Sequence, residues 1–139
     1  FRGREPEVIG NLTANTPYIL HEFCDSFNEC FNVDQRFYIR DKKMIGSRSI
    51  SMKKRPALVL TISHLIVPNI ITPYYLKPEN WRINHRHLVS TYNTLQAAAG
   101  FMMEALSFDD PHRLQRVLQI GMGGGVTTNF LSLIPINVS

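Results

Sequence analysis

A run of glycines near the C-terminal end of the sequence most constrains what this chain can fold into. The stretch R-V-L-Q-I-G-M-G-G-G-V-T-T-N-F-L, Arg116–Leu131, places Gly121, Gly123, Gly124 and Gly125 within one short window. Glycine permits backbone angles and close approaches that any side chain would block. The window therefore predicts a tight turn whose backbone a ligand, such as the ribose of a nucleotide, could approach closely.

The residues on either side of the glycines predict a strand, a turn and a helix in succession. Val117–Ile120 has the apolar and β-favouring composition of a short buried strand. Val126–Leu133 can form a helix until Pro135 ends it. A turn in that position presents free backbone N–H groups to an anion or to a ribose edge.

Three nucleotide-binding motifs compete for this glycine run. The P-loop requires Lys and Ser or Thr directly after its last glycine, but Val126 and Thr127 stand there. The dinucleotide motif G-x-G-x-x-G requires a small residue at the position of Val126. The remaining pattern, G-x-G-x-G, is matched by Gly121, Gly123 and Gly125.

This pattern resembles the first motif of class I S-adenosylmethionine-dependent enzymes, and most closely their spermidine-synthase-like branch. The resemblance implies that Gly121, Met122, Gly123, Gly124 and Gly125 bind S-adenosylmethionine. That branch contains methyltransferase-like proteins and polyamine aminopropyltransferases. Aminopropyltransferases usually carry Asp at the place of Gly124, so the resemblance favours methyl transfer, to a polyamine or to a protein side chain.

The resemblance also implies an α/β fold. We expect a β-meander, then a helix, then the first strand–turn–helix unit of an incomplete Rossmann-like methyltransferase sheet. The corresponding divisions are a mixed N-terminal segment over 1–33, a small β-rich domain with a proline-rich loop over 34–81, and the start of an S-adenosylmethionine-binding domain over 82–139. The specific letters of the resemblance lie only between Arg116 and Phe130.

Hydrophobic periodicity predicts the elements before the glycines. Residues that favour β-structure, separated by turns, indicate strands over 36–40, 47–52 and 57–62. The spacing of apolar residues from Asn84 to Leu106 follows one face of a helix. Earlier in the chain, Tyr18–Phe31 has the pattern of a short amphipathic segment. Prolines over 68–81 predict an ordered loop.

Charge and hydropathy limit the partners. The 139-residue chain has a formal net charge of +4, but its basic residues are spread over short groups and no nucleic-acid module accompanies them. We therefore expect no nucleic-acid partner. No apolar run reaches the length of a membrane span, so the sequence predicts no membrane partner and leaves a small-molecule cofactor.

Two cysteines and two sequons leave the compartment open. Cys24 and Cys30 could close a small disulfide loop, and Asn11 and Asn137 begin glycosylation acceptor patterns, which together indicate secretion. Two free thiols and chance sequons explain the same letters, and that interpretation is preferred here. The intracellular use of S-adenosylmethionine, implied by the resemblance, favours the cytoplasm.

The remaining candidates for chemistry have simpler explanations. His85 and His87 lack a nearby third metal ligand and fit a polar helix start. Tyr92 and Gln96 share a helix face near the glycines. Asp109-Asp110 precedes a proline and indicates a helix stop.

The resemblance further predicts that this sequence is part of a longer enzyme. In Rossmann-type sites an acidic residue about 20 residues after the glycines holds the ribose hydroxyls, and the sequence reaches Ser139 before one appears. We therefore expect catalytic residues outside this sequence and no activity from this piece alone. The alternative hypothesis is a non-catalytic binding or interaction module, secreted and glycosylated.

Overall fold

A computed structural model describes residues 17–110, 112–121 and 123–138. The chain forms two compact units, Phe1–Asn84 and His85–Ser139. Each unit is described by itself below. In the described residues, no helix combines the length and the apolar character that crossing a membrane would need.

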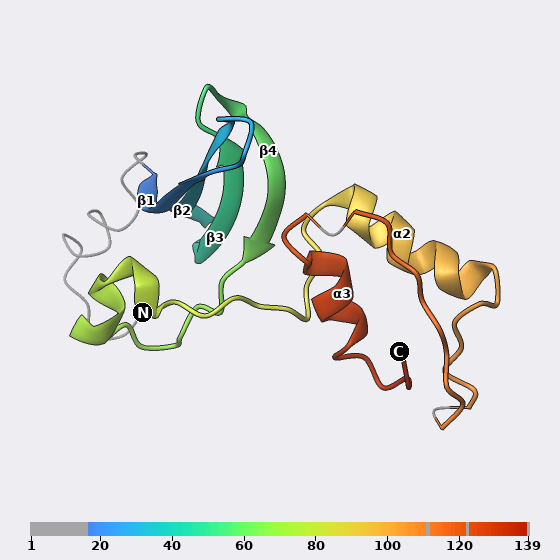
Figure 1. Cartoon of the computed structure of the whole chain (residues 1–139). Helices are drawn as coiled ribbons and strands as arrows, with labels where there is room; N and C mark the ends of the chain where they lie inside the picture. The colour runs from blue at the N-terminus through green and yellow to red at the C-terminus, as the bar shows by residue number, and fades with distance from the viewer. Residues whose placement is uncertain (1–16, 111, 122, 139) are drawn as a thin grey trace. The chain divides into compact units, whose positions relative to one another are not determined.

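The first unit contains a four-stranded antiparallel sheet. Its strands are β1 (Tyr18–Cys24), β2 (Cys30–Arg40), β3 (Lys43–Met52) and β4 (Arg55–His64), and their spatial order is the order of the chain (Figure 1). β2 and β3 are joined by only two residues, Asp41-Lys42, both with positive φ. Positive φ at both positions matches the twist of a tight hairpin turn, and Asp tolerates it better than most residues.

The sheet is longer than the periodicity predicts. The expected amphipathic segment over Tyr18–Phe31 is instead β1, a turn and the start of β2. β2 begins at Cys30, before the expected start at Arg36. The prediction missed this part of the strand because the residues that it buries, Asp34 and Gln35, are polar. Alternation of apolar and polar letters cannot reveal a strand whose buried positions are polar.

One face of the sheet carries the apolar core. Phe37, Met44, Leu65, Ile71 and Trp81 are buried together. The rings of Phe37 and Trp81 lie 4.5 Å apart between centroids. Phe37 pairs in register with Gly46, where a Cβ would lie 2.8 Å from the Phe37 ring. Only glycine lets the ring lie flat over the backbone at this point.

The loop after β4 closes this core. It contains the short 3-10 helices η1 (Pro73–Leu76) and η2 (Pro78–Asn80), each started by a proline, as the fixed φ of proline favours. Trp81 follows directly and donates a hydrogen bond from Nε1 to the Tyr75 carbonyl oxygen, 2.8 Å away. The residue that fills the core thus comes from the proline-rich loop and not from a strand.

Two polar side chains of the sheet, Gln35 and Arg48, hold the same loop by hydrogen bonds, and this pair is called the polar clasp below. Gln35 and Arg48 are register partners on β2 and β3. The Arg48 guanidinium donates to Gln35 Oε1 at 2.6 Å and to the carbonyl oxygens of Pro78 and Trp81 at 3.3 and 3.1 Å. Burial lowers the pKa of Arg48. The hydrogen-bond acceptors of this guanidinium are neutral amide and carbonyl oxygens.

The opposite face of β2 and β3 holds a second polar group. The buried carboxylate of Asp34 accepts hydrogen bonds from Ser49 Oγ at 2.8 Å and Ser51 Oγ at 2.7 Å. Arg36 Nε lies 3.6 Å from the same carboxylate. A buried carboxylate is tolerated because these donors replace the water that it loses.

The second unit contains two helices, α2 (Thr91–Met102) and α3 (Val126–Leu131). Ala97, Leu106 and Leu131 form its buried cluster. α2 is shorter than the expected helix over Asn84–Leu106, because the Asn84 amide donates to the His64 carbonyl oxygen in an extended pairing. At its other end the left-handed backbone of Glu104 stops the helix.

The predicted Rossmann-like sheet is wrong. The sheet that the structure contains is an antiparallel meander, and Val117–Ile120 forms no strand. In the described part of the second unit, parallel pairing is limited to one bridge, between Gln115 and Val138, with Gln115 N donating to the Asn137 carbonyl oxygen at 2.8 Å. A parallel strand needs hydrogen-bonded neighbours on its edges, and Val117–Ile120 has none there. α3 also ends at Leu131, before the expected Leu133.

Apolar side chains of this unpaired segment are left in solvent. Leu118 is 87% exposed and Ile120 is 89% exposed. We expect the chain to bind an anilinonaphthalene sulfonate dye, because such dyes report contiguous exposed apolar surface. The double variant Leu118→Gln/Ile120→Gln should lose most of the fluorescence enhancement. Phe27→Gln, an isolated residue that is 85% exposed, should lose little of it; equal losses would place the dye elsewhere.

Candidate functional site

The glycine turn adopts a backbone that few other residues could follow. Gly121, Gly123 and Gly125 have φ of +82°, +52° and +70°. Left-handed backbone costs a residue with a side chain about 1–2 kcal/mol. Gly124 lies exposed within the turn, and Met122 lies outside the described residues. The alternating glycines of the motif are therefore the ones that the turn requires.

Two of these glycines also face open space. Among the described residues, no atom beyond the immediate chain neighbours lies within 4 Å of the place where a Cβ of Gly121 or Gly123 would stand. Packing inside the unit therefore does not exclude a side chain at either position. The backbone of the turn is accessible, and an external group could approach it closely.

Polar side chains tie this turn to α3. Thr128 Oγ1 donates to Gln119 Oε1 at 2.7 Å, and Gln119 Nε2 lies 3.4 Å from the Gly121 carbonyl oxygen. One residue earlier, Thr127 Oγ1 accepts from Asn93 Nδ2 of α2 at 2.9 Å. None of these residues was predicted as a site residue, although two hydroxyl side chains directly after the glycines are a signal that the sequence carries.

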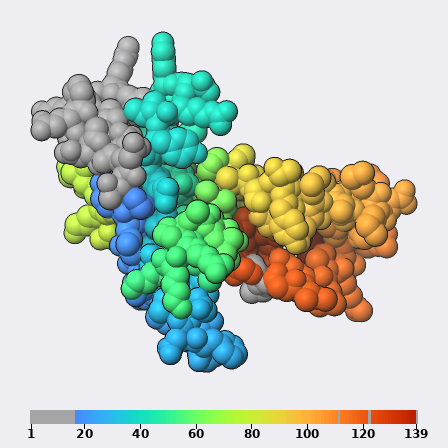
Figure 2. All heavy atoms as spheres, turned by 90° about the horizontal axis from the view of Figure 1, so that it is seen from above, coloured from blue at the N-terminus to red at the C-terminus, as the bar shows by residue number. Residues whose placement is uncertain are grey.

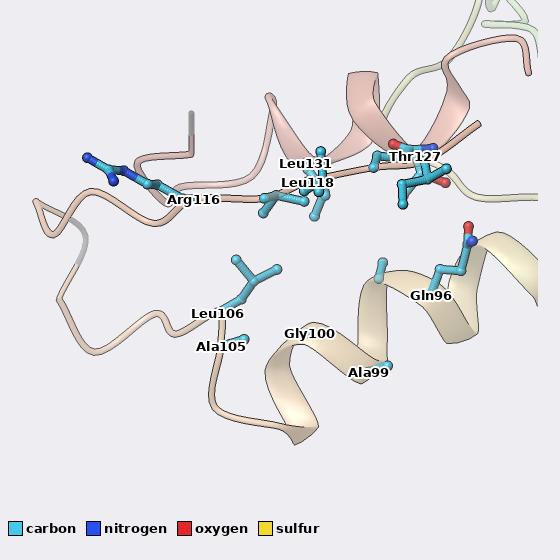
Figure 3. A pocket seen from close by; sticks show the side chains of 13 residues that line it. Gln96, Ala99, Gly100, Ala105, Leu106, Arg116, Leu118, Thr127 and Leu131 are labelled. Atoms are coloured by element: carbon cyan, nitrogen blue, oxygen red, sulfur yellow. The ribbon is translucent and has the colours of Figure 1, made fainter. Parts of the chain in front are cut away.

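A cavity of about 450 Å³ lies beside the turn, within the second unit. In Figure 3, Leu106 and Leu118 point into it from opposite sides, and Gln96 and Thr127 lie toward one end. One wall of the cavity is formed by α2, whose small residues there leave room: Ala97, Ala99 and Gly100. The cavity is mostly apolar, with Gln96 and Thr127 toward one end and Arg116 toward the other (Figure 3), and a mostly apolar lining with a few polar groups is common in small-molecule sites.

The other predicted candidates occupy simpler positions. Gln96 Nε2 donates to the Tyr92 hydroxyl oxygen at 2.8 Å along α2, so the two residues interact with each other. Asp110 Oδ1 accepts the backbone amides of His112 and Arg113, as a turn-forming residue does. Over the described residues, no group of three potential metal ligands includes His85 or His87.

The cysteines are not free thiols, which corrects the preferred interpretation of the sequence. Cys24 and Cys30 form a disulfide across the end of the β1–β2 hairpin, where they are direct register partners. Glu22 joins them in a group with metal-ligand character. Both sulfurs are bonded to each other, and the Glu22 carboxylate pairs with Lys53 Nζ at 2.7 Å, so this group holds no open cation site.

Comparison of the chain with protein-family models, with curated proteins and with solved structures finds no match.

Proposed function

We propose that this chain supplies the cofactor turn of an S-adenosylmethionine-dependent transferase, and that the group transferred is methyl. The observation that carries the proposal is the open, left-handed backbone at Gly121 and Gly123. Those two glycines and Gly125 match the G-x-G-x-G pattern of the first motif of these enzymes. The proposal concerns the turn itself and does not depend on a Rossmann-like sheet.

The residues of the turn suit the proposed ligand. The bare backbone at Gly121 and Gly123 leaves room for the amino-acid and ribose portions of the cofactor to come close. Gln119 and Thr128 would hold the turn in that shape through their 2.7 Å hydrogen bond. When bound, the cofactor supplies an electrophilic methyl group on a sulfonium.

The task left to the protein in such a transfer is positioning. An acceptor must be held in line with the transferring carbon, and orientation of this kind accounts for a large part of the rate. The cavity next to the turn offers apolar walls with Gln96 and Thr127 at one end. Arg116 lines the cavity toward its other end, so the chemistry of the cavity suits an acceptor with an apolar body and polar groups at its ends.

A strained substitution in the turn tests the proposal. In the natural polypeptide that carries this sequence, Gly123→Val should weaken S-adenosylmethionine binding by at least about tenfold, measured by calorimetry, because a β-branched side chain both disfavours left-handed backbone and fills the open space. Unchanged affinity would show that the turn does not bind the cofactor.

Lys42→Val is the control. Lys42 also has positive φ, at +61°, but it lies in the hairpin turn of the first unit and does not line the cavity beside the glycine turn. The control therefore places valine on left-handed backbone outside the unit that holds the proposed site, and cofactor affinity should stay within about twofold of the parent. A loss equal to that of Gly123→Val would assign both effects to folding.

The second candidate function is a non-catalytic binding module of a secreted protein. The Cys24–Cys30 disulfide favours it, because such bonds persist mainly in oxidising compartments. Asn137 of one sequon is exposed, and Asn11 of the other lies outside the described residues. Glycans at these positions, together with no cofactor binding by the natural polypeptide, would favour this function over the transferase.

A further inference from the structure

We propose that Cys24 is the sulfur at which a small-molecule thiol opens the Cys24–Cys30 disulfide, and that this bond determines how firmly β1 is held on the sheet. The bond closes the end of the β1–β2 hairpin, which projects from the first unit (blue, Figure 2). The inference is independent of the proposed transferase function. It assigns a site of thiol exchange, with a mixed disulfide on Cys24 as its product.

The loop between the cysteines has hydrogen bonds of its own in addition to the disulfide. Asp25 Oδ1 accepts the backbone amides of Phe27 and Glu29, each at 2.9 Å, and Asp25 N donates to the Glu29 carbonyl oxygen at 2.9 Å. Asn28 takes the left-handed backbone that the turn needs, at φ +60°. These contacts keep the two sulfurs near each other after reduction, so the bond can form again.

The two cysteine residues differ in exposure. Cys24 is exposed, whereas Cys30 is half-buried, with its Sγ 3.9 Å from the Asn28 carbonyl oxygen. Thiol exchange requires a thiolate to reach one sulfur along the axis of the bond, so the more accessible sulfur is attacked faster. Cys24 is therefore attacked, and Cys30 departs as a thiolate.

The exchange balances with a small thiol as reductant. The incoming thiolate forms a new sulfur–sulfur bond to Cys24 as the bond to Cys30 breaks, and the Cys30 thiolate takes up a proton. A second thiolate then attacks the small-molecule sulfur of the mixed disulfide and releases the thiolate of Cys24. The protein disulfide gains two electrons, and the two small thiols become one disulfide.

Besides the disulfide, β1 is held by its antiparallel ladder with β2, which runs from Tyr18 to Cys24. β1 is an edge strand, with β2 as its one neighbour in the described sheet, and most of its side chains are exposed. Tyr18 packs against the core, and Phe23 stacks on Phe31 of β2 at 5.4 Å between centroids. The Glu22–Lys53 ion pair is exposed, and pairs of that kind contribute little. Without the disulfide, the strand should open locally far more often.

The site of attack is tested on the oxidised chain. Brief treatment with limiting reduced glutathione, an acid quench and peptide mapping should find glutathione on Cys24 at least about ten times as often as on Cys30, because attack follows access. Two single-cysteine variants repeat the comparison from the other direction: with glutathione disulfide, Cys30→Ser should be modified several times faster than Cys24→Ser. Equal modification, or free thiols in the air-oxidised chain, would overturn the assignment.

Hydrogen exchange tests the effect on β1. On reduction, the β1 amides should exchange at least about ten times faster, while the β3 amides keep their protection, because only the edge strand opens. Cys24→Ser/Cys30→Ser should match the reduced chain, and reoxidation should restore protection. Protection of β3 shows that the fold is intact in each sample. Unchanged exchange in β1 would show that the disulfide does not hold the strand.

Discussion

Truncation of Trp81 to alanine is expected to lower the free energy of unfolding of the first unit by about 3–5 kcal/mol. Trp81 is 1% exposed and packs against Phe37 at the centre of the core. The change would leave a cavity the size of an indole ring and remove the hydrogen bond to the Tyr75 carbonyl oxygen. Trp81 is the one tryptophan of the sequence, so urea unfolding should be followed by circular dichroism.

Tyr74→Ala is the control for this prediction. Tyr74 lies in the same loop and contacts Tyr75 edge-on, but it is 61% exposed. Its removal should cost no more than about 1 kcal/mol, since little apolar surface returns to water. If the two variants were destabilised equally, the loop would be acting as a whole and Trp81 would not be the anchor of the core.

Replacement of Arg48 by methionine is expected to cost about 2–3 kcal/mol. Methionine keeps the apolar stem, but Gln35 Oε1 then loses its donor in a residue that is 0% exposed. The carbonyl oxygen of Trp81 loses the Arg48 donor as well. A buried acceptor without a partner retains its full desolvation cost. Urea unfolding measures the effect.

The double variant Gln35→Leu/Arg48→Met separates the clasp from simple packing. It replaces the Gln35 amide as well as the guanidinium, so no side-chain oxygen at position 35 is left without a donor, and it should recover part of the stability lost by Arg48→Met. The Pro78 and Trp81 carbonyl oxygens still lose donors, so the recovery should be incomplete. A double variant less stable than the parent by the sum of the two single-variant losses would show that the two side chains act independently.

Arg48 should not make stability depend on pH in the neutral range. Its pKa is lowered by burial, so the folded chain binds this proton less tightly than the unfolded chain does. That penalty is fully present below the folded pKa and is relieved only as the pH rises through it, in the alkaline range. Unfolding measured between about pH 6 and 9 should therefore show no trend from this group.

The residue pattern predicted the central hairpin of the sheet because aromatic and β-branched residues such as Phe37, Tyr38 and Ile50 favour strands, although the buried residues of β3 include Ser47, Ser49 and Ser51. The expected strands over 36–40 and 47–52 lie within β2 and β3. The first half of β2 and the whole of β1 escaped prediction. In β2 the buried positions include Asp34, whose partners Ser49 and Ser51 come from another strand. A sequence window cannot show that a polar residue has found donors so far along the chain.

The candidate site was predicted in part. The glycine pattern predicted a turn, and Gly121, Gly123 and Gly125 do adopt a backbone that suits glycine. The prediction of a strand before them was wrong, because Val117–Ile120 is not part of a sheet. Its apolar residues are equally consistent with an unpaired segment. Strand formation depends on a neighbour to pair with, and local composition does not supply one.

Local features were determined by the sequence alone: the glycine turn follows from the backbone freedom of its residues, and the spacing of apolar residues placed a helix within 84–106, although not its ends. Only the tertiary structure decided which polar residues are buried, that Trp81 of the loop fills the core, and that Cys24 meets Cys30. The physical reason is that backbone preference acts within a few residues, whereas burial, hydrogen-bond satisfaction and disulfide pairing depend on which distant atoms the folded chain brings together.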